Sequence, residues 1–236
     1  MWTRTAGSRG FFNLPRRYRM LKKGYRMEKK FIERSCEDFA AMLSSKAPVP
    51  GGGGAAALVG ALGVALGSMV GNLTIGRKKY ASVEEDIRFV LRRAETVQAR
   101  LLELVDQDAE AFEPLSRAYS IPKEDPAREE TLESAARAAC QAPLEMMQSV
   151  CEAIELLEIM LEKGSVTLVS DVGCGALCCA AALEGASMNV FVNTKTMQDR
   201  KYAARLDARA DALLAEYAPR ARRIADEAGR RLRNGG

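Results

Sequence analysis

Histidine is absent from this chain of 236 residues. Its absence excludes every catalytic triad that depends on an imidazole, and it removes the ligand on which most catalytic zinc sites depend. Any proton transfer must therefore be carried out by carboxylates, lysine or tyrosine. Aromatic residues are also scarce, at 6%. Alanine, leucine, glutamate and arginine are plentiful instead, and this composition favours helices.

Paired cysteine motifs and secretion signals are missing as well. None of the six cysteines forms a CxxC pair, and the N-terminal segment lacks an apolar core long enough for a signal peptide. We therefore expect free, buried thiols and a cytoplasmic protein with no bound metal or cofactor. Cys174 and Cys178 lie one helical turn apart and could bind a metal, but their Ala- and Gly-rich surroundings favour small core residues.

A charge balance strong enough to indicate a nucleic-acid partner is also lacking. The formal net charge is +4, but residues 1–26 contain eight Lys and Arg residues and no acid, so the remaining chain is net negative. A nucleic-acid interpretation would rest on this segment alone, and we expect no such partner. We interpret residues 1–26 as a basic extension, either a targeting arm or sequence ahead of a true start at Met27, and residues 27–236 as one helical domain.

The stretch 48–80 is the most unusual part of the sequence. Four glycines, 51–54, precede an apolar run that continues to about Ile75, and a cationic cluster, 77–80, follows. Three interpretations are compatible with glycines followed by such a run: a transmembrane helix, a phosphate-binding loop, and the buried central helix of a bundle.

Two of these three interpretations are weakened by what the run contains. The Walker pattern requires GK followed by Ser or Thr, and that sequence is absent. The run is about 20 residues long, as a membrane span requires, but it includes polar residues, and we identify no second span of this kind. Glycines at 63, 67 and 71 predict a smooth helical stripe against which another backbone can pack closely. We therefore expect a buried central helix and no membrane association.

Apolar periodicity predicts an all-α fold, an antiparallel up-and-down bundle of about six long helices. The expected helices span residues 29–46, from the glycine run to 75, 83–119, 127–161 with a kink near Pro143, 170–191 and 199–233. Residues 166–169 form the only strand-like fragment, which is too short to matter. The second and fifth of these helices are apolar nearly all round, and burying both favours a homodimer.

Two aspartates in the third expected helix are candidates for acid–base chemistry. Asp106 and Glu110 share one face, whereas Asp108 lies roughly 200° around the helix from Asp106, on the apolar side. A carboxylate there is expected to be half-buried with a raised pKa unless a cation lies beside it. Periodicity alone leaves a solvated acidic face equally open.

Three further groups of polar residues adjoin the apolar helices. The 77–80 cluster offers an anion site, although cations at a helix C-terminus also interact favourably with the helix dipole. Asp171 begins the fifth expected helix, where N-cap duty would explain it. Asn189 and Asn193 lie four residues apart on the same helix, and their amides need partners, either on neighbouring helices or on a heterocycle.

Four motifs in order resemble one protein family. They are PVPGGGGAAA, GSMVGNLTIGRKKY, VDQDAEAF and SDVGCGALCCAAALEGASMNVFVNTK. They are similar to the C-terminal domain of formiminotransferase-cyclodeaminases and to stand-alone cyclodeaminases and methenyltetrahydrofolate cyclohydrolases. The similarity covers about residues 30–230, and the transferase domain has no counterpart here. Gly54 stands where the family often has serine, and residues 1–26 match nothing in the family.

The resemblance implies an all-α, dimeric enzyme of one-carbon folate metabolism. The first activity that it implies is cyclisation of 5-formiminotetrahydrofolate to 5,10-methenyltetrahydrofolate with release of ammonia. This reaction is a step of histidine degradation, and a separate formiminotransferase would supply its substrate. The alternative is hydrolysis of 5,10-methenyltetrahydrofolate to 10-formyltetrahydrofolate. A further alternative is a folate-binding or scaffold protein without turnover.

Site residues also follow from the resemblance. Asp108 is the first choice for the proton carrier and Asp106 the second, and Lys79 would protonate the leaving amine or hold a carboxylate. Arg77 and Lys78 would attract the tail of a folate that carries one or several glutamates. The substrate-binding residues implied are Gly51, Gly52, Gly53, Arg77, Lys78, Tyr80, Asp171, Asn189 and Asn193.

Overall fold

The computed structural model describes residues 30–234, and within this range it contains seven α-helices and no strand. The chain divides into two units, Met1–Lys30 and Phe31–Gly236, and the second is the one described here. The expected basic extension, 1–26, and the start at Met27 lie outside the described residues. The helices are α1 (Cys36–Leu43), α2 (Gly52–Thr74), α3 (Glu84–Ala118), α4 (Arg128–Ala139), α5 (Gln141–Lys163), α6 (Val169–Thr194) and α7 (Arg200–Asn234).

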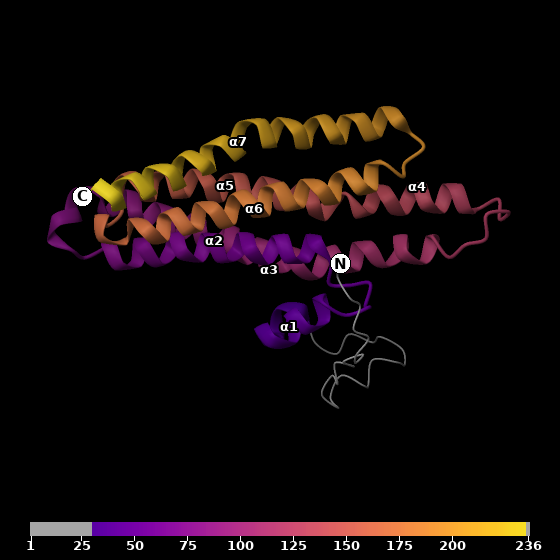
Figure 1. The fold of residues 1–236 in the computed structure, drawn as a ribbon, viewed down its shortest axis with the longest axis horizontal. Helices are drawn as coiled ribbons and strands as arrows, with labels where there is room; N and C mark the ends of the chain where they lie inside the picture. The colour runs from indigo at the N-terminus through magenta and orange to yellow at the C-terminus, as the bar shows by residue number, and fades with distance from the viewer. Residues whose placement is uncertain (1–29, 235–236) are drawn as a thin grey trace, which may run out of the picture. The chain divides into compact units, whose positions relative to one another are not determined.

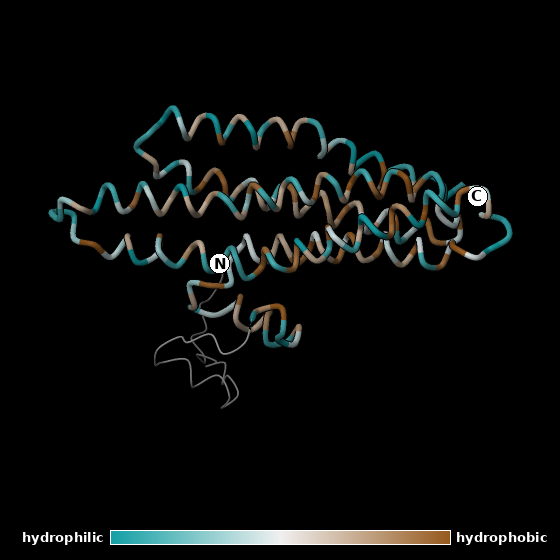
Figure 2. Tube along the Cα trace, turned by 180° about the vertical axis from the view of Figure 1, so that it is seen from behind, coloured by the Kyte–Doolittle hydropathy of each residue, from teal (hydrophilic) through white to brown (hydrophobic). Residues whose placement is uncertain are grey.

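The long helices of this unit form a bundle, as the sequence predicted (Figure 1). α2 packs mainly against α6 and α3, α6 packs against α2 and α7, and α5 contacts all four of these helices. α7 alternates polar and apolar residues along its length, which is visible as alternating colours on the uppermost helix of Figure 2. Such a helix buries one face and exposes the other.

The glycines of α2 allow close contact with its neighbours. A Cβ at Gly63 would lie 2.8 Å from the carbonyl oxygen of Gly175 on α6, so the two backbones touch there. Gly67 and Gly71 instead make room for leucine side chains, Leu157 of α5 and Leu91 of α3. The predicted glycine stripe therefore faces the interior of the bundle.

The expected kink near Pro143 is a complete break between α4 and α5, at Cys140. Proline has no backbone N–H and its ring clashes with the carbonyl four residues earlier, which here is that of Ala139. α4 ends at Ala139, and its carbonyl oxygen accepts a hydrogen bond of 3.0 Å from the side-chain Nδ2 of Asn193 on α6. A side chain from another helix thus takes the place of the missing N–H.

The first expected helix, 29–46, is much shorter than expected, and the other helix ends differ from expectation by a few residues. The first expected helix is a 3₁₀ turn, Phe31–Glu33, followed by the short α1, and the strand-like 166–169 segment is a 3₁₀ turn that leads into α6. Gly76 follows α2 with φ +75°, a conformation that glycine adopts without strain. The expected cap at Gly76 is therefore present.

Two helices pass the length and composition test for a membrane span, α2 and the segment Val166–Thr194. The expectation of a single such run was therefore wrong. About half of each apolar window is buried inside the protein, 56% and 50% respectively. The core helices of a soluble bundle pass the same test, so this finding is weak support for a membrane.

The thiols are free, but not all are buried. Cys140, Cys151 and Cys179 are buried, and burial raises the pKa of each to about 12. Cys36 and Cys174 are exposed, which corrects the expectation of a wholly buried set. Residues 30–234 contain no cluster of three or more Cys, Asp or Glu side chains that could hold a metal ion.

Candidate active site

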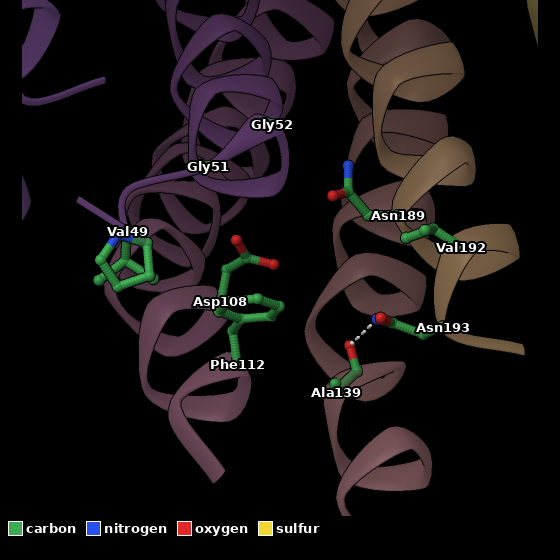
Figure 3. Close-up of a pocket in the computed structure, with 10 residues that line it drawn as sticks. Val49, Gly51, Gly52, Asp108, Phe112, Ala139, Asn189, Val192 and Asn193 are labelled. Carbon is green, nitrogen blue, oxygen red and sulfur yellow. Dashed lines mark hydrogen bonds between the residues drawn. The ribbon is translucent and has the colours of Figure 1, made fainter. Parts of the chain in front are cut away.

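A cavity of about 210 Å³ lies at the N-terminal end of α2. The loop before α2, the C-terminal half of α3, the end of α4 and the last turns of α6 surround it (Figure 3). Its lining residues are Pro48, Val49, Gly51, Gly52, Asp108, Phe112, Ala139, Asn189, Val192 and Asn193. Asp108 is the only titratable side chain in this set.

Asp108 is held at the start of α2 by the backbone. Gly51, the N-cap residue of α2, has no side chain with which to cap the helix, and the Asp108 Oδ2 accepts a hydrogen bond of 3.0 Å from the Gly54 N–H instead. Burial raises the pKa of Asp108 to about 6, and the bond from Gly54 opposes that rise. The expected half-buried position and raised pKa are confirmed. A carboxyl group with this pKa exchanges protons readily near neutral pH.

Gly53 makes this arrangement possible. A Cβ at this position would overlap all three atoms of the Asp108 carboxylate group. A Cβ at Gly52 would lie 3.6 Å from the Asn189 side chain, and one at Gly51 would meet nothing within 4 Å. The glycine run is therefore required chiefly at Gly53, where the acid lies directly against the backbone.

Two asparagines of α6 form the opposite wall of the cavity. The Nδ2 of Asn189 donates to the Gly185 carbonyl oxygen at 2.8 Å, and the Nδ2 of Asn193 donates to Ala139 as described above. In Figure 3 the Asn189 side-chain oxygen is directed toward the space in front of Asp108. The expected pair thus lies in the site, with one amide available as an acceptor and the other engaged in holding α4.

Asp106 lies outside this cavity and is itself buried, with 5% of its surface exposed. Its Oδ1 accepts a hydrogen bond of 2.6 Å from the Phe31 N–H, and its Oδ2 is buried without a partner. The carboxylate therefore anchors the segment that precedes α1. Periodicity did not predict this burial, because the segment that covers Asp106 is remote in sequence.

The cationic cluster and Asp171 lie at the other end of the α2–α6 pair. α2 separates Gly51 from the cluster by 23 residues, about 34 Å at roughly 1.5 Å per residue. Arg77 Nη1 donates to the Ser165 Oγ at 3.5 Å, and Tyr80 accepts from the Val166 N–H at 3.1 Å. These two bonds tie the cluster to the turn before α6, and Asp171 lies close by in the first turn of that helix. The expected N-cap role of Asp171 is wrong, because α6 begins at Val169 and its N-cap residue is Leu168.

Tyr80 and Lys79 differ in their surroundings within this cluster. Hydrogen bonds from Val166 and Ser165, and then the nearby Lys79 and Arg77, hold the pKa of Tyr80 below its ordinary value. Lys79 lies over the Tyr80 ring, 5.6 Å from its centroid. The predicted site residues therefore fall into two groups within one chain. The group at the cavity is Asp108, Gly51, Gly52, Gly53, Asn189 and Asn193. The group at the other end of the α2–α6 pair is Arg77, Lys78, Lys79, Tyr80 and Asp171.

Several residues of the cavity were not predicted from the sequence. Phe112 lies one turn after Asp108 on α3, Val192 lies in the last turn of α6, and Val49 lies in the loop before α2. Phe112 could have been found, since it follows the acid at i+4 and shares its face. Ala139 could not, because its role depends on the helix break.

The fold and this site define an all-α protein with a buried acid–base carboxyl group at the start of a glycine-rich helix. The family model described as formiminotransferase-cyclodeaminase matches residues 35–212. The chain belongs to this family.

Relatives of two kinds share this likeness. A methenyltetrahydrofolate cyclohydrolase from Methylorubrum extorquens is 43% identical over 184 residues, which are 76% of this chain and 88% of the relative. A formimidoyltransferase-cyclodeaminase from Mus musculus is 31% identical over 193 residues, 80% of this chain but 36% of the relative. The chain thus spans about a third of this bifunctional relative.

A solved structure supports the same assignment. The crystal structure of a formiminotetrahydrofolate cyclodeaminase from Thermotoga maritima superposes with a TM-score of 0.73 and 28% sequence identity. The match covers 83% of this chain and 98% of that one. The similarity therefore extends over most of this chain and nearly all of the solved one.

Proposed function

We propose that this protein hydrolyses 5,10-methenyltetrahydrofolate to 10-formyltetrahydrofolate, and that Asp108 carries the proton in this reaction. The observation behind the proposal is the placement of Asp108, buried against the glycine run with a pKa raised to about 6. The likeness to a cyclohydrolase along 88% of that relative's length favours ring opening over the alternative.

The chemistry requires one group that both accepts and returns a proton. Water adds to the carbon that bridges N5 and N10, and its proton passes to the ionised Asp108. The tetrahedral carbon then loses its bond to N5, which takes the proton back from Asp108, while the hydroxyl group on that carbon releases its own proton to water and becomes the oxygen of the formyl group on N10. A carboxyl group with a pKa near the working pH serves both steps with little penalty.

Cyclisation of 5-formiminotetrahydrofolate is the second candidate, because the solved relative from Thermotoga maritima is named for that activity. Here N10 attacks the formimino carbon, Asp108 accepts the N10 proton, and ammonia leaves after protonation. Both reactions pass through a tetrahedral carbon between N5 and N10, so one cavity can serve either.

The walls of the cavity suit a flat, polar heterocycle. Phe112 and Val192 offer apolar surface, and the Asn189 side-chain oxygen can accept a hydrogen bond from an amino group on the pterin edge. Gly51 and Gly52 leave the backbone open to close approach. We assign these residues to substrate binding and Asn193 to positioning the wall.

Turnover of each folate by the purified protein tests the proposal. We expect loss of the methenyl absorbance with 5,10-methenyltetrahydrofolate and 10-formyltetrahydrofolate as product. Accumulation of that absorbance from 5-formiminotetrahydrofolate, with ammonia release, would identify the second activity instead. Folate binding without turnover of either compound would identify a non-catalytic binding protein and refute the proposed function.

The remaining assignments complete the proposal. We infer a homodimer in the cytoplasm that needs no cofactor beyond its tetrahydrofolate substrate and binds neither nucleic acid nor membrane. The apolar surface of α2 and α6 supports the dimer. A separate formiminotransferase is a partner only if the second activity is found.

A further inference from the structure

The candidate site has a carboxyl group but no cation. Among the described residues, no Lys or Arg lines the cavity, and Asp108 has no ion-pair partner. A folate carries at least one carboxylate on its tail, so a site for it needs positive charge within reach. Arg77, Lys78 and Lys79 have no acidic partner within the described chain, yet they lie about 34 Å away along α2.

An apolar face connects these two ends. Of the twelve large apolar side chains exposed in the described part of the chain, six lie on α2 and α6. They are Leu62, Met69 and Leu73 on α2, and Leu177, Met188 and Val192 on α6. Both rows follow helical spacing, and Val192 and Gly52 bring both into the cavity.

The size of this face suits a second copy of the chain. Two adjacent helices of about 34 Å, with a joint width of about 20 Å, offer roughly 700 Å². A stable interface buries about 800 Å² on each partner. Exposed apolar patches of this size mark interaction sites.

Charge selects how two such faces would pair. A two-fold axis parallel to the helices would set cluster against cluster and Asp108 near its copy, which is unfavourable for like charges. An axis perpendicular to the helices makes the two α2 helices antiparallel. It sets each cationic cluster beside the partner's cavity, so unlike groups meet.

The spacing of the α2 row agrees with the perpendicular axis. One row of exposed or partly exposed residues on this helix consists of Gly52, Ala55, Val59, Leu62, Leu66, Met69 and Leu73. This row is nearly symmetric about Leu62, so if Leu62 meets its own copy, Leu73 lies opposite Gly51. The cluster that follows Leu73 would then reach the partner's loop at Pro48, which lines the cavity.

We infer that each active site is shared between two chains, with Asp108 and the glycine run from one and Arg77, Lys78 and Lys79 from its partner. The inference rests on the proposed function, since it assigns the partner's cations to the carboxylate tail of the folate. Asp171, at the same end of the pair as the cluster, would come to the shared site by the same symmetry.

Complementation between two inactive variants tests the sharing. Chains with Asp108→Asn and chains with Arg77→Gln, Lys78→Gln and Lys79→Gln are produced together with different tags and purified through both. We expect each parent to lose at least tenfold in kcat/KM and the mixed dimer to recover about half of the wild-type activity, because one of its two sites is intact. A mixed dimer no more active than its parents, or a cation variant with wild-type kcat/KM, would overturn the inference.

A second measurement does not depend on turnover. In a Cys36→Ser, Cys174→Ser background, Leu62→Cys is expected to cross-link to its own copy on mild oxidation. Phe89→Cys, equally exposed at 50% but on α3, is the matched control and should not cross-link. If the wild-type protein turns over neither folate, the proposed function fails while this result still decides the pairing.

The mass of the protein completes the test. We expect a dimer by light scattering for the wild type and for Phe89→Asp, and a monomer for Leu62→Asp, in which two carboxylates would meet at the axis. A monomeric wild type, or one that needs detergent and binds lipid vesicles, would assign the face to another occupant and refute the sharing.

Discussion

Two aspartates only two residues apart on α3 have different surroundings and different roles. Asp106 accepts the Phe31 N–H and holds the chain ahead of α1, whereas Asp108 caps α2 and faces the cavity. Periodicity predicted that they lie on different sides of α3 with Asp108 on the apolar side, but Asp106 is the more deeply buried of the two, with 5% of its surface exposed. It could not predict what covers either one, because both partners are more than 50 residues away.

Removal of the titrating group at position 108 should abolish one limb of the pH profile. The wild-type kcat/KM should rise through about pH 6 as Asp108 ionises and then level off. Asp108→Asn should be slower by roughly 10²- to 10⁴-fold and should lack that rise. Steady-state rates between pH 4.5 and about 8 check this; a variant that keeps the rise would exclude Asp108 as the titrating base.

The same substitution should change how stability depends on pH. The pKa of Asp108 is raised on folding from 3.8 to about 6, so the folded state binds its proton more tightly than the unfolded state. Asp108 therefore favours folding most below pH 3.8, and this contribution is lost as the pH rises through about 6. The loss amounts to about 3 kcal/mol, and urea titrations of wild type and Asp108→Asn should converge at low pH and diverge above 6. Parallel curves would contradict the raised pKa.

A methyl group at Gly53 should displace the acid without removing it. Because a Cβ there overlaps the Asp108 carboxylate, Gly53→Ala should lower kcat/KM by more than tenfold and destabilise the protein by about 1–3 kcal/mol. Gly51→Ala, whose Cβ meets nothing within 4 Å, is the control for stability and should change it little. Equal stability of the two variants would show that the carboxylate moves aside freely.

At the level of elements, the sequence predicted the helices well where apolar spacing is long and regular. α3 and α7 begin and end within two residues of expectation. The break between α4 and α5 was expected only as a kink. Whether a proline bends or interrupts a helix depends on what satisfies the freed carbonyl, and here that group is Asn193, which no local pattern connects to Ala139.

The stabilising effect of Asn193 should therefore depend on Pro143. Asn193→Ala leaves the buried Ala139 carbonyl oxygen without its donor and should cost about 1–3 kcal/mol of unfolding free energy. In a Pro143→Ala background the residue at 143 has an N–H that can reach that oxygen, so the same substitution should cost less. A double-mutant cycle by urea denaturation measures this coupling; a coupling of zero would mean that the two residues act independently.

At the level of the whole molecule, the all-α bundle follows from composition and periodicity, but the distribution of the site does not. The motifs around Asp108 and around Arg77 were assigned to one site, although within one chain they lie near opposite ends of α2. A sequence gives the order of motifs along the chain and says little about which ends of a bundle adjoin.

Salt should weaken substrate capture if the cationic cluster attracts the folate tail. Exposed charges are screened beyond about 8–10 Å at physiological ionic strength, so the KM for a polyglutamylated folate should rise several-fold between low salt and about 0.5 M. The KM of the Arg77→Gln, Lys78→Gln, Lys79→Gln variant should change little over the same range. A salt response identical in both proteins would assign the attraction to other residues.

The bond between Asp108 and the Gly54 N–H has one more consequence for the working cycle. The oxygen that accepts this N–H belongs to the group that must take up and release the travelling proton, so every protonation loosens the first turn of α2 and every release tightens it. Local opening of the first turn of α2 would then be coupled to each catalytic turnover. Amide hydrogen exchange at Gly54 would measure this coupling: the exchange rate should be low when Asp108 is ionised and higher when Asp108 is protonated.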